Sequence, residues 1–353
     1  MKAWDDEAHS GREGIAGGSA PEVLDELSAR GIDLDPRRDA AATHRHDGVE
    51  HASDHAHPHA HAEPGEPPIT GIVGAGAVGT ALGVALARAG WPIHAIASRD
   101  EGRRARFREL VPGARGFAEA EALLDEVELA ILAVPDDALP ELASELRMYS
   151  GQAMVHTSGA LGAEVLEPAR AAGTQIGAFH PLVAFADLER AVVALRGATV
   201  AIEGDDQLAD LLARMADVLG ATAVRLAPGS KAAYHAAAML SAGGFVALLD
   251  AIAELGRVAG LDEAGAIAIY GGLVDQTLGN ARALGIDRAL TGPIVRGDVG
   301  TIRRHLAALG ADAPDVLPLY RAVAERELTI GERRGAVAPE VAAEIRHAVA
   351  MPD

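Results

Sequence analysis

The 353-residue chain is 49% hydrophobic and 23% charged, which is typical of a globular protein with a large core. It contains no cysteine, and this excludes disulfides, thiolate metal sites and cysteine nucleophiles. A formal net charge of −20 argues against a nucleic-acid partner, because such a partner needs a basic surface. No apolar run reaches the roughly 20 residues of a membrane span, and the N-terminal MKAWDDEAHSG has no apolar signal core. We therefore expect a cytoplasmic protein with no membrane partner.

Residues 1–66 form an acidic, histidine-rich extension that we predict to be disordered. Within it, only PEVLDELSAR, residues 21–30, has the apolar spacing of a short helix. Further along, histidines alternate with other residues from His55 to His61, and such a density can bind zinc, nickel or copper weakly. A solvated linker is the preferred interpretation, because a flexible chain fixes no coordination geometry. No metal site is therefore assigned.

The stretch ITGIVGAGAVG, residues 69–79, predicts the strand, glycine turn and helix start of a dinucleotide-binding βαβ unit. Gly74 allows the tight turn out of the strand, Gly76 lets backbone N–H groups approach a pyrophosphate, and Gly79 allows close helix packing. The following helix, TALGVALARAG, would present its positive N-terminal end to the anion. The alternatives are a Rossmann domain that has lost its ligand and a glycine-rich turn in another α/β sheet. The cofactor residues predicted in this loop are Gly74, Gly76, Ala77, Val78 and Gly79.

The end of the second predicted strand, PIHAIA, indicates which dinucleotide binds. A carboxylate here would accept a hydrogen bond from the ribose 2′-hydroxyl of NAD, whereas the 2′-phosphate of NADP needs a hydroxyl or a cation. Ser98 and Arg99 suit the phosphate, and Asp100 comes one position too late to decide the matter. The sequence therefore predicts NADP in preference to NAD. Arg103 and Arg104 are interpreted as the exposed face of the next helix.

Apolar segments that alternate with helical patterns predict further strands of a parallel sheet. In such a sheet the carboxyl ends of the strands line the ligand crevice. Val134 and Pro135 are therefore expected near the nicotinamide half of the cofactor, and Asp136 is expected to cap the next helix. The predicted strands lie at residues 129–134, 153–157, 175–180, 198–203 and 222–226.

Two polar residues follow the strands of the second half of this sheet. Ser158 is either a substrate hydrogen-bonder or the cap of a helix at residues 161–172. His180 is either an acid, base or orienting group for the substrate or a buried structural histidine. Both would stand at the same edge of the sheet as the glycine loop.

A helical region begins at residue 228, and small residues dominate one long predicted helix that ends near residue 260. Lys231 and His235 are spaced i and i+4, so they lie on one face of it. A lysine in a dry cleft can donate a proton or stabilise an oxyanion, and the alternative is an exposed lysine at a helix start. More helices are predicted at residues 261–285, 299–309, 313–334 and 337–350.

The turn TGPIVRGD precedes one of these helices. Arg296 in this turn could clamp a substrate carboxylate bidentately, and a structural pair with Asp298 is the alternative. We expect Asp298 to cap the helix that follows.

The order GIVGAGAVG, SR, AVPD, GATVAIEGDD and PGSKAAYHAAAMLSAG resembles the β-hydroxyacid and 6-phosphogluconate dehydrogenase superfamily, with ketopantoate reductase and pyrroline-5-carboxylate reductase as relatives. Its hydroxyacid enzymes carry a catalytic lysine with an asparagine four residues later, and the matching positions here are Lys231 and His235. The segments VHTSGALGAEVL, FHPLVAF and LTGPIVRGDVGTIRRHLAAL more closely resemble an uncharacterised bacterial family. Its members join a Rossmann-like NADP-oxidoreductase domain to a helical domain of unknown function. The resemblance covers about residues 69–330 and implies the fold, while it hardly constrains the substrate.

We therefore predict an α/β protein in which a Rossmann domain with a doubly wound parallel sheet, residues 67–227, precedes an all-α domain, residues 228–353. The resemblance implies that this second domain is like the C-terminal domain of 6-phosphogluconate dehydrogenase. We expect a homodimer through the helical domain, because its small residues suit close packing at a subunit interface.

The leading hypothesis is an NADP-dependent oxidoreductase that transfers hydride between the nicotinamide and a small carbonyl, imine or hydroxyacid in the interdomain cleft. The alternative is a non-catalytic protein that senses NADP(H). The predicted catalytic residues are Lys231, His235 and Ser158, and the predicted substrate-binding residues are Ser158, His180 and Arg296.

Overall fold

The structure is a computed structural model, and it describes residues 66–148, 151–170, 174–227 and 229–350. The predicted short helix and the alternating histidines of the N-terminal extension lie outside these residues. The chain divides into two compact units between Ala238 and Met239. Lys231 and His235 therefore belong to the first unit, although the predicted domain boundary lies before residue 228.

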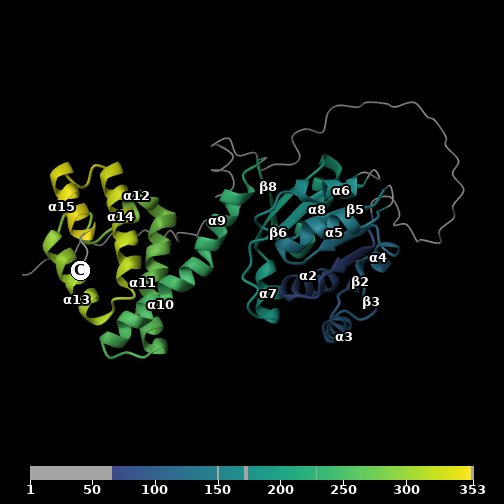
Figure 1. Cartoon of the computed structure of the whole chain (residues 1–353), viewed down its shortest axis with the longest axis horizontal. Coiled ribbons are helices and arrows are strands. Elements are labelled where there is room, and N and C mark those ends of the chain that lie inside the picture. Colours follow the sequence, from purple (N-terminus) through teal and green to yellow (C-terminus); the bar gives the residue numbers. More distant parts are fainter. Residues whose placement is uncertain (1–65, 149–150, 171–173, 228, 351–353) are drawn as a thin grey trace, which may run out of the picture. The chain divides into compact units, whose positions relative to one another are not determined.

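The first unit contains one eight-stranded sheet with the order β3-β2-β1-β4-β5-β6-β7-β8 (Figure 1). Strands β1 to β6 are parallel, β7 is antiparallel to β6, and β8 is parallel to β7. The order reverses between β1 and β4, and a ligand crevice is expected beyond the carboxyl ends of these two strands. The strands are β1 (Thr70–Val73), β2 (Ile93–Ala97), β3 (Arg115–Phe117), β4 (Leu129–Leu132), β5 (Ala153–His156), β6 (Gln175–Pro181), β7 (Thr199–Gly204) and β8 (Thr222–Arg225).

Helices cover both faces of this sheet, which confirms the predicted doubly wound fold. One hydrophobic cluster joins the sheet to α2, α3, α7 and α8, and a second joins it to α4, α5 and α6. The predicted helix at residues 161–172 is replaced by a short 3-10 turn and the four-residue α6. The helices of this unit are α2 (Ala77–Arg88), α3 (Glu101–Leu110), α4 (Ala120–Leu124), α5 (Leu139–Glu145), α6 (Glu167–Arg170), α7 (Leu188–Leu195) and α8 (Asp206–Leu219), and α9 (Lys231–Ser241) follows them.

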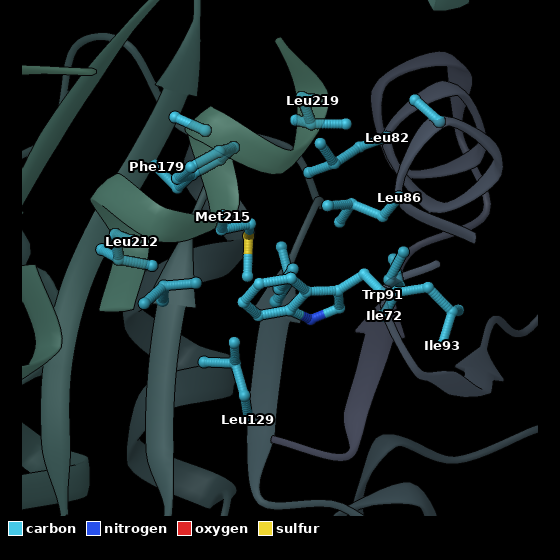
Figure 2. Packing of buried hydrophobic residues seen from close by; sticks show 14 of the residues in the cluster. Ile72, Leu82, Leu86, Trp91, Ile93, Leu129, Phe179, Leu212, Met215 and Leu219 are labelled. Carbon is cyan, nitrogen blue, oxygen red and sulfur yellow. The ribbon is translucent and has the colours of Figure 1, made fainter. Parts of the chain in front are cut away.

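The indole of Trp91 anchors the first cluster. Figure 2 shows it among apolar side chains such as Leu86 and Met215, and it is only 4% exposed. Its Nε1 donates a hydrogen bond of 2.9 Å to Oγ1 of Thr70, at the start of β1. The buried polar atom is thus satisfied, and the helices are held against the strand that leads into the glycine loop.

The second unit is all-α, as predicted. The expected long helix is broken at Ala242, whose φ of −111° and ψ of −86° are not helical, and Gly243 and Gly244 follow the break. The core of this unit joins α13, α14 and α15. Its helices are α10 (Gly243–Val258), α11 (Glu263–Leu284), α12 (Ile286–Ala289), α13 (Val299–Asp312), α14 (Leu317–Arg333) and α15 (Pro339–Ala350).

Candidate cofactor and substrate pocket

The glycine loop between β1 and α2 has the geometry of a pyrophosphate cradle. Gly74 has a φ of +107°, and a Cβ on it would lie 2.2 Å from the carbonyl oxygen of Ala133, so glycine is required there. A Cβ on Gly79 would lie 2.0 Å from the carbonyl oxygen of Gly74. A Cβ on Gly76 would meet no atom within 4 Å, which means that its side-chain position faces open space. The three predicted roles, a turn, an approach for the ligand and close packing, agree with this geometry.

The N-terminus of α2 is free to receive an anion. Its N-cap residue is Gly76, no side chain caps the helix, and its first turn contains no acidic residue. The first N–H groups of a helix have no partner within the helix, and the helix dipole adds positive potential there. A phosphate group therefore fits this position.

An open pocket of 980 Å³ lies over the carboxyl ends of the strands of the first unit. It brings together most of the predicted site residues from β1, β2, β4, β5, β6 and α9. Three predicted site residues do not line it. Gly79 packs against the backbone of the loop, Lys231 is buried, and Arg296 belongs to the second unit. The predicted residues that line the pocket are Gly74, Gly76, Ala77, Val78, Ser98, Arg99, Val134, Pro135, Ser158, His180 and His235.

The end of β2 offers cations and a hydroxyl to the pocket. Ser98 and Arg99 line it as predicted, and Arg103 on α3 lines it as well. Arg103 is exposed on α3, as interpreted, and this exposed face also lines the pocket. Asp100 caps α3 by accepting a hydrogen bond of 3.0 Å from the backbone N–H of Arg103. Arg104 instead donates to the carbonyl oxygen of Ser98.

Asp136 occupies the pocket wall at the end of β4, next to Val134 and Pro135. The prediction that it caps the following helix is wrong. The N-cap position of the 3-10 turn Asp136–Ala138 is Pro135, and no side-chain hydrogen bond caps either that turn or α5. The Asp136 carboxylate therefore caps no helix among the described residues.

A buried histidine that sequence reasoning overlooked organises the loop after β5. His156 is fully buried, its Nδ1 accepts a hydrogen bond of 3.1 Å from the N–H of Ser158, and its Nε2 lies 3.0 Å from the carbonyl oxygen of Gly162. The Nε2 atom must therefore carry the proton in the neutral ring. Burial and the charge of Lys231 lower the pKa of His156 to about 4. The sequence signal that could have identified His156 is its place as the last residue of a buried strand.

Ser158 does not cap a helix, because Gly162 holds the N-cap position of the 3-10 turn Ala163–Leu166, and its role as a substrate hydrogen-bonder stays a prediction. Its Oγ accepts hydrogen bonds from the N–H groups of Ala160, at 3.2 Å, and Leu161, at 3.0 Å, so it orders the loop. It also lines the pocket, where it is 6% exposed. The next residue, Gly159, leaves room for two imidazoles, because a Cβ there would lie 2.2 Å from Nδ1 of His235 and 2.6 Å from Nε2 of His180.

His180 and His235 form an edge-to-face pair with ring centroids 5.6 Å apart. Nδ1 of His180 lies 3.3 Å from the hydroxyl of Tyr234, and Nδ1 of His235 is buried without a hydrogen-bond partner. Burial, followed by the charge of Lys231, lowers the pKa of His180 to about 4. Burial raises the pKa of Tyr234 to about 12. This part of the pocket therefore contains an uncharged imidazole and an uncharged phenol at neutral pH.

Lys231 is buried behind this pair, with a side chain that is 4% exposed. Its Nζ lies 3.6 Å from Oε2 of Glu203, beyond hydrogen-bonding distance. Burial lowers the pKa of Lys231, and the charges of Glu203, Glu164 and Asp136 oppose that shift. The alternative of an exposed lysine at a helix start is thus wrong, and the lysine is an internal charge one helical turn before His235.

The second unit contains the remaining predicted residues. Asp298 caps α13, as predicted, by accepting hydrogen bonds from the N–H of Thr301 at 2.9 Å and from its Oγ1 at 2.7 Å. These hydrogen bonds lower the pKa of Asp298, and Arg304 and Arg296 contribute more weakly. Arg296 is exposed. Its predicted role as a carboxylate clamp stays a prediction.

Two family models match the chain. Residues 64–181 match a Rossmann-like domain, and residues 198–327 match a domain of unknown function, DUF2520. A comparison with curated proteins gives no significant match. The two family matches agree with the resemblance found in the sequence.

Solved structures with the same fold include three from different organisms. A Bacteroides fragilis protein described as a "putative NADP oxidoreductase" has a TM-score of 0.64 and 25% identity, over 74% of this chain and 98% of that one. A reductive aminase from Aspergillus terreus in complex with NADPH and ethyl levulinate has a TM-score of 0.58 and 17% identity, over 80% and 99%. A 1-pyrroline-5-carboxylate reductase from Streptococcus pyogenes has a TM-score of 0.52 and 16% identity, over 74% and 99%. The chain thus joins a Rossmann-like domain to a DUF2520 domain.

Proposed function

We propose that the protein is an NADP-dependent oxidoreductase. The observation that carries this proposal is one pocket in which an uncapped helix N-terminus, two arginines and a cluster of histidines meet. The similarity to the B. fragilis protein described as a "putative NADP oxidoreductase" supports it. NADPH would supply the hydride, and a small carbonyl, imine or hydroxyacid would be its reaction partner.

The pocket residues divide between the two halves of the cofactor. The N–H groups at the start of α2 would bind the pyrophosphate, because they are unpaired and the side-chain position of Gly76 is open. Ser98, Arg99 and Arg103 would bind the 2′-phosphate through charge-assisted hydrogen bonds. Pro135, at the end of β4, would contact the nicotinamide half, since that half lies beyond the topological switch point.

The substrate end of the pocket would then be formed by Ser158, His180 and His235. His235 is the residue that we expect to contact the substrate, because its buried Nδ1 has no partner within the described residues. Lys231 would act as a positioning residue through its charge. That charge lowers the pKa values of His156 and His180 and so favours their neutral forms.

The test uses full-length protein and two readouts. NADPH binding is followed by the fluorescence of the nicotinamide, and turnover is followed at 340 nm with a panel of carbonyls, imines and hydroxyacids. We expect His235→Ala to lose turnover by at least about 100-fold while NADPH affinity is unchanged. The matched control is His305→Ala, which removes an exposed histidine of the second unit.

The outcomes separate the proposal from the sensor hypothesis. NADPH binding without turnover of any compound would favour a protein that senses NADP(H). Loss of NADPH affinity in His235→Ala would refute its assignment to the substrate end. Full turnover in that variant would refute its catalytic role.

We also propose a homodimer through the helices that follow the pocket. Most large apolar side chains exposed in the described residues lie between Met239 and Ile286. Leu240 is 65% exposed, Ile269 is 59% exposed and Leu273 is 60% exposed. A monomer rarely exposes so large an apolar surface, and a second copy of the chain would cover it.

A membrane is the competing explanation for this surface. Lys231–Val258 is the one helical segment of the described residues that is long and apolar enough to cross a membrane, and 6% of its apolar window is buried. Its start, however, holds the buried Lys231 and the pocket residue His235, and Ala242 interrupts its helical conformation. These features favour a protein partner over a bilayer.

A further inference from the structure

The substrate end of the pocket has an unbalanced negative charge. Asp136 is the one formally charged side chain among the described residues that line the pocket at the ends of β4, β5 and β6 and on α9. It is exposed and does not cap a helix, so its carboxylate is available to a ligand. The other polar groups at this end are hydroxyls and imidazoles.

The charges behind the wall do not compensate for Asp136. The ammonium of Lys231 is paired with Glu203 at 3.6 Å, and Glu164 and Asp136 also act on it electrostatically. One ammonium against three carboxylates leaves a formal charge of −2.

Three groups at this end of the pocket are poor proton donors, which leaves His235 as the remaining imidazole of the described pocket wall. The Nε2 proton of His156 is directed to Gly162, His180 is held neutral, and Tyr234 is a weak acid. Hydride addition to a ketone produces an alkoxide, which needs a proton from the enzyme. Hydride addition to an iminium ion produces a neutral amine and needs none.

We infer that the substrate of this pocket is a cationic imine, which Asp136 and the surrounding carboxylates attract and keep in its protonated form. This inference rests on the proposed NADP-dependent activity. The hydride leaves C4 of NADPH with its electron pair and forms a C–H bond at the iminium carbon. The C=N π electrons become the nitrogen lone pair, so NADPH and the iminium ion give NADP⁺ and a neutral amine. The reverse reaction would oxidise an unprotonated amine.

The experiment measures binding to the protein·NADP⁺ complex by calorimetry, with three ligands of similar size: pyrrolidinium, cyclopentanone and cyclopentanecarboxylate. Wild-type protein should bind pyrrolidinium at least about tenfold more tightly than cyclopentanone, and the carboxylate most weakly. Asp136→Asn should weaken pyrrolidinium binding roughly three- to tenfold and leave cyclopentanone unchanged, because only the charge is removed. Asp137→Asn is the matched control, since its neighbouring carboxylate does not line the pocket.

Turnover gives a second readout. N-methyl-1-pyrrolinium, which is permanently cationic, should be reduced by NADPH at a rate that depends little on pH, and cyclopentanone should not be reduced. Failure of NADP⁺ to bind would overturn the proposed function and this inference together. If NADP⁺ binds but the complex does not prefer the cation, the inference alone is overturned. The same holds if NADP⁺ binds and none of the three ligands does. A preference for the carboxylate over the cation would overturn it in favour of a hydroxyacid.

Discussion

Two glycines of the same loop allow cofactor binding and folding to be separated. Gly76 and Gly79 are three residues apart, but a Cβ on Gly76 would meet nothing within 4 Å, whereas a Cβ on Gly79 would lie 2.0 Å from a backbone oxygen. Alanine at 76 therefore fills space that the ligand needs, and alanine at 79 fills space that the fold needs. The pair forms a matched experiment.

The expected magnitudes follow from these distances. Gly76 has a φ of −79°, which alanine adopts freely, so Gly76→Ala should gain about 0.4–1 kcal/mol through the unfolded state. Alanine is a poorer N-cap than glycine, and this offsets the gain. Its methyl group would keep the pyrophosphate from at least one charge-assisted hydrogen bond, a loss of roughly 10- to 100-fold in NADPH affinity. For Gly79→Ala, overpacking of the methyl group against the backbone lowers the free energy of unfolding by about 3 kcal/mol. The higher helix propensity of alanine raises it by about 1 kcal/mol. The net loss of about 2 kcal/mol lowers Tm by roughly 4–8 °C.

The assays are NADPH fluorescence titration and thermal unfolding without ligand. Gly76→Ala should lose affinity at an unchanged or slightly higher Tm, and Gly79→Ala should lose Tm. Wild-type affinity in Gly76→Ala would show that the ligand does not approach this loop. An unchanged Tm in Gly79→Ala would show that α2 is not packed on β1 as closely as the structure has it.

Four further outcomes are expected. Arg99→Ala should weaken NADPH binding by roughly tenfold and leave NADH binding unchanged in the same titration, and equal losses for both cofactors would contradict a 2′-phosphate contact. Lys231→Met should raise the pKa of His180, measured by NMR titration, because a positive charge that disfavours its protonation is removed. The free energy of unfolding should fall by about 4 kcal/mol between pH 7 and pH 5, because His156 and His180 each take up a proton near 6.5 when unfolded and near 4 when folded. This loss should be about halved in His156→Asn. Leu273→Asp should convert the dimer to monomer in light scattering. Val193→Asp of the first unit should not, although Val193 is 70% exposed and Leu273 is 60% exposed.

The sequence was sufficient for the features that depend on short-range chemistry. The glycine loop, the strands that follow it and the cap at Asp298 each have a local signature, and the structure has all of them. Strand β3 was missed because it is three residues long with two exposed residues at an edge of the sheet, so it has no hydrophobic pattern. The break at Ala242 was missed because alanine and glycine were interpreted as packing residues of one helix.

The pocket residues that were misjudged depend on long-range contacts. Asp136 after a strand has the sequence context of a helix cap, and only the geometry of the turn shows that it faces the pocket. Arg103 lies on an exposed helix face as interpreted, and only the place of α3 in the fold shows that this face also lines the pocket. His156 lies in an apolar strand without any local motif, and its role emerges from Ser158 and Gly162.

Lys231 and His235 show why one helical face can hold two different roles. A spacing of four residues places two side chains on the same face of a helix, one turn apart. It does not determine which neighbouring residues each side chain contacts. One turn separates a lysine that meets Glu203 from a histidine that meets the pocket. A charge placed there acts on His156 and His180 although Lys231 does not line the pocket. Burial is the larger cause that lowers their pKa values and the charge of Lys231 is the second, so a neutral His180 stands in the same pocket wall as Asp136, as the proposed cationic substrate requires.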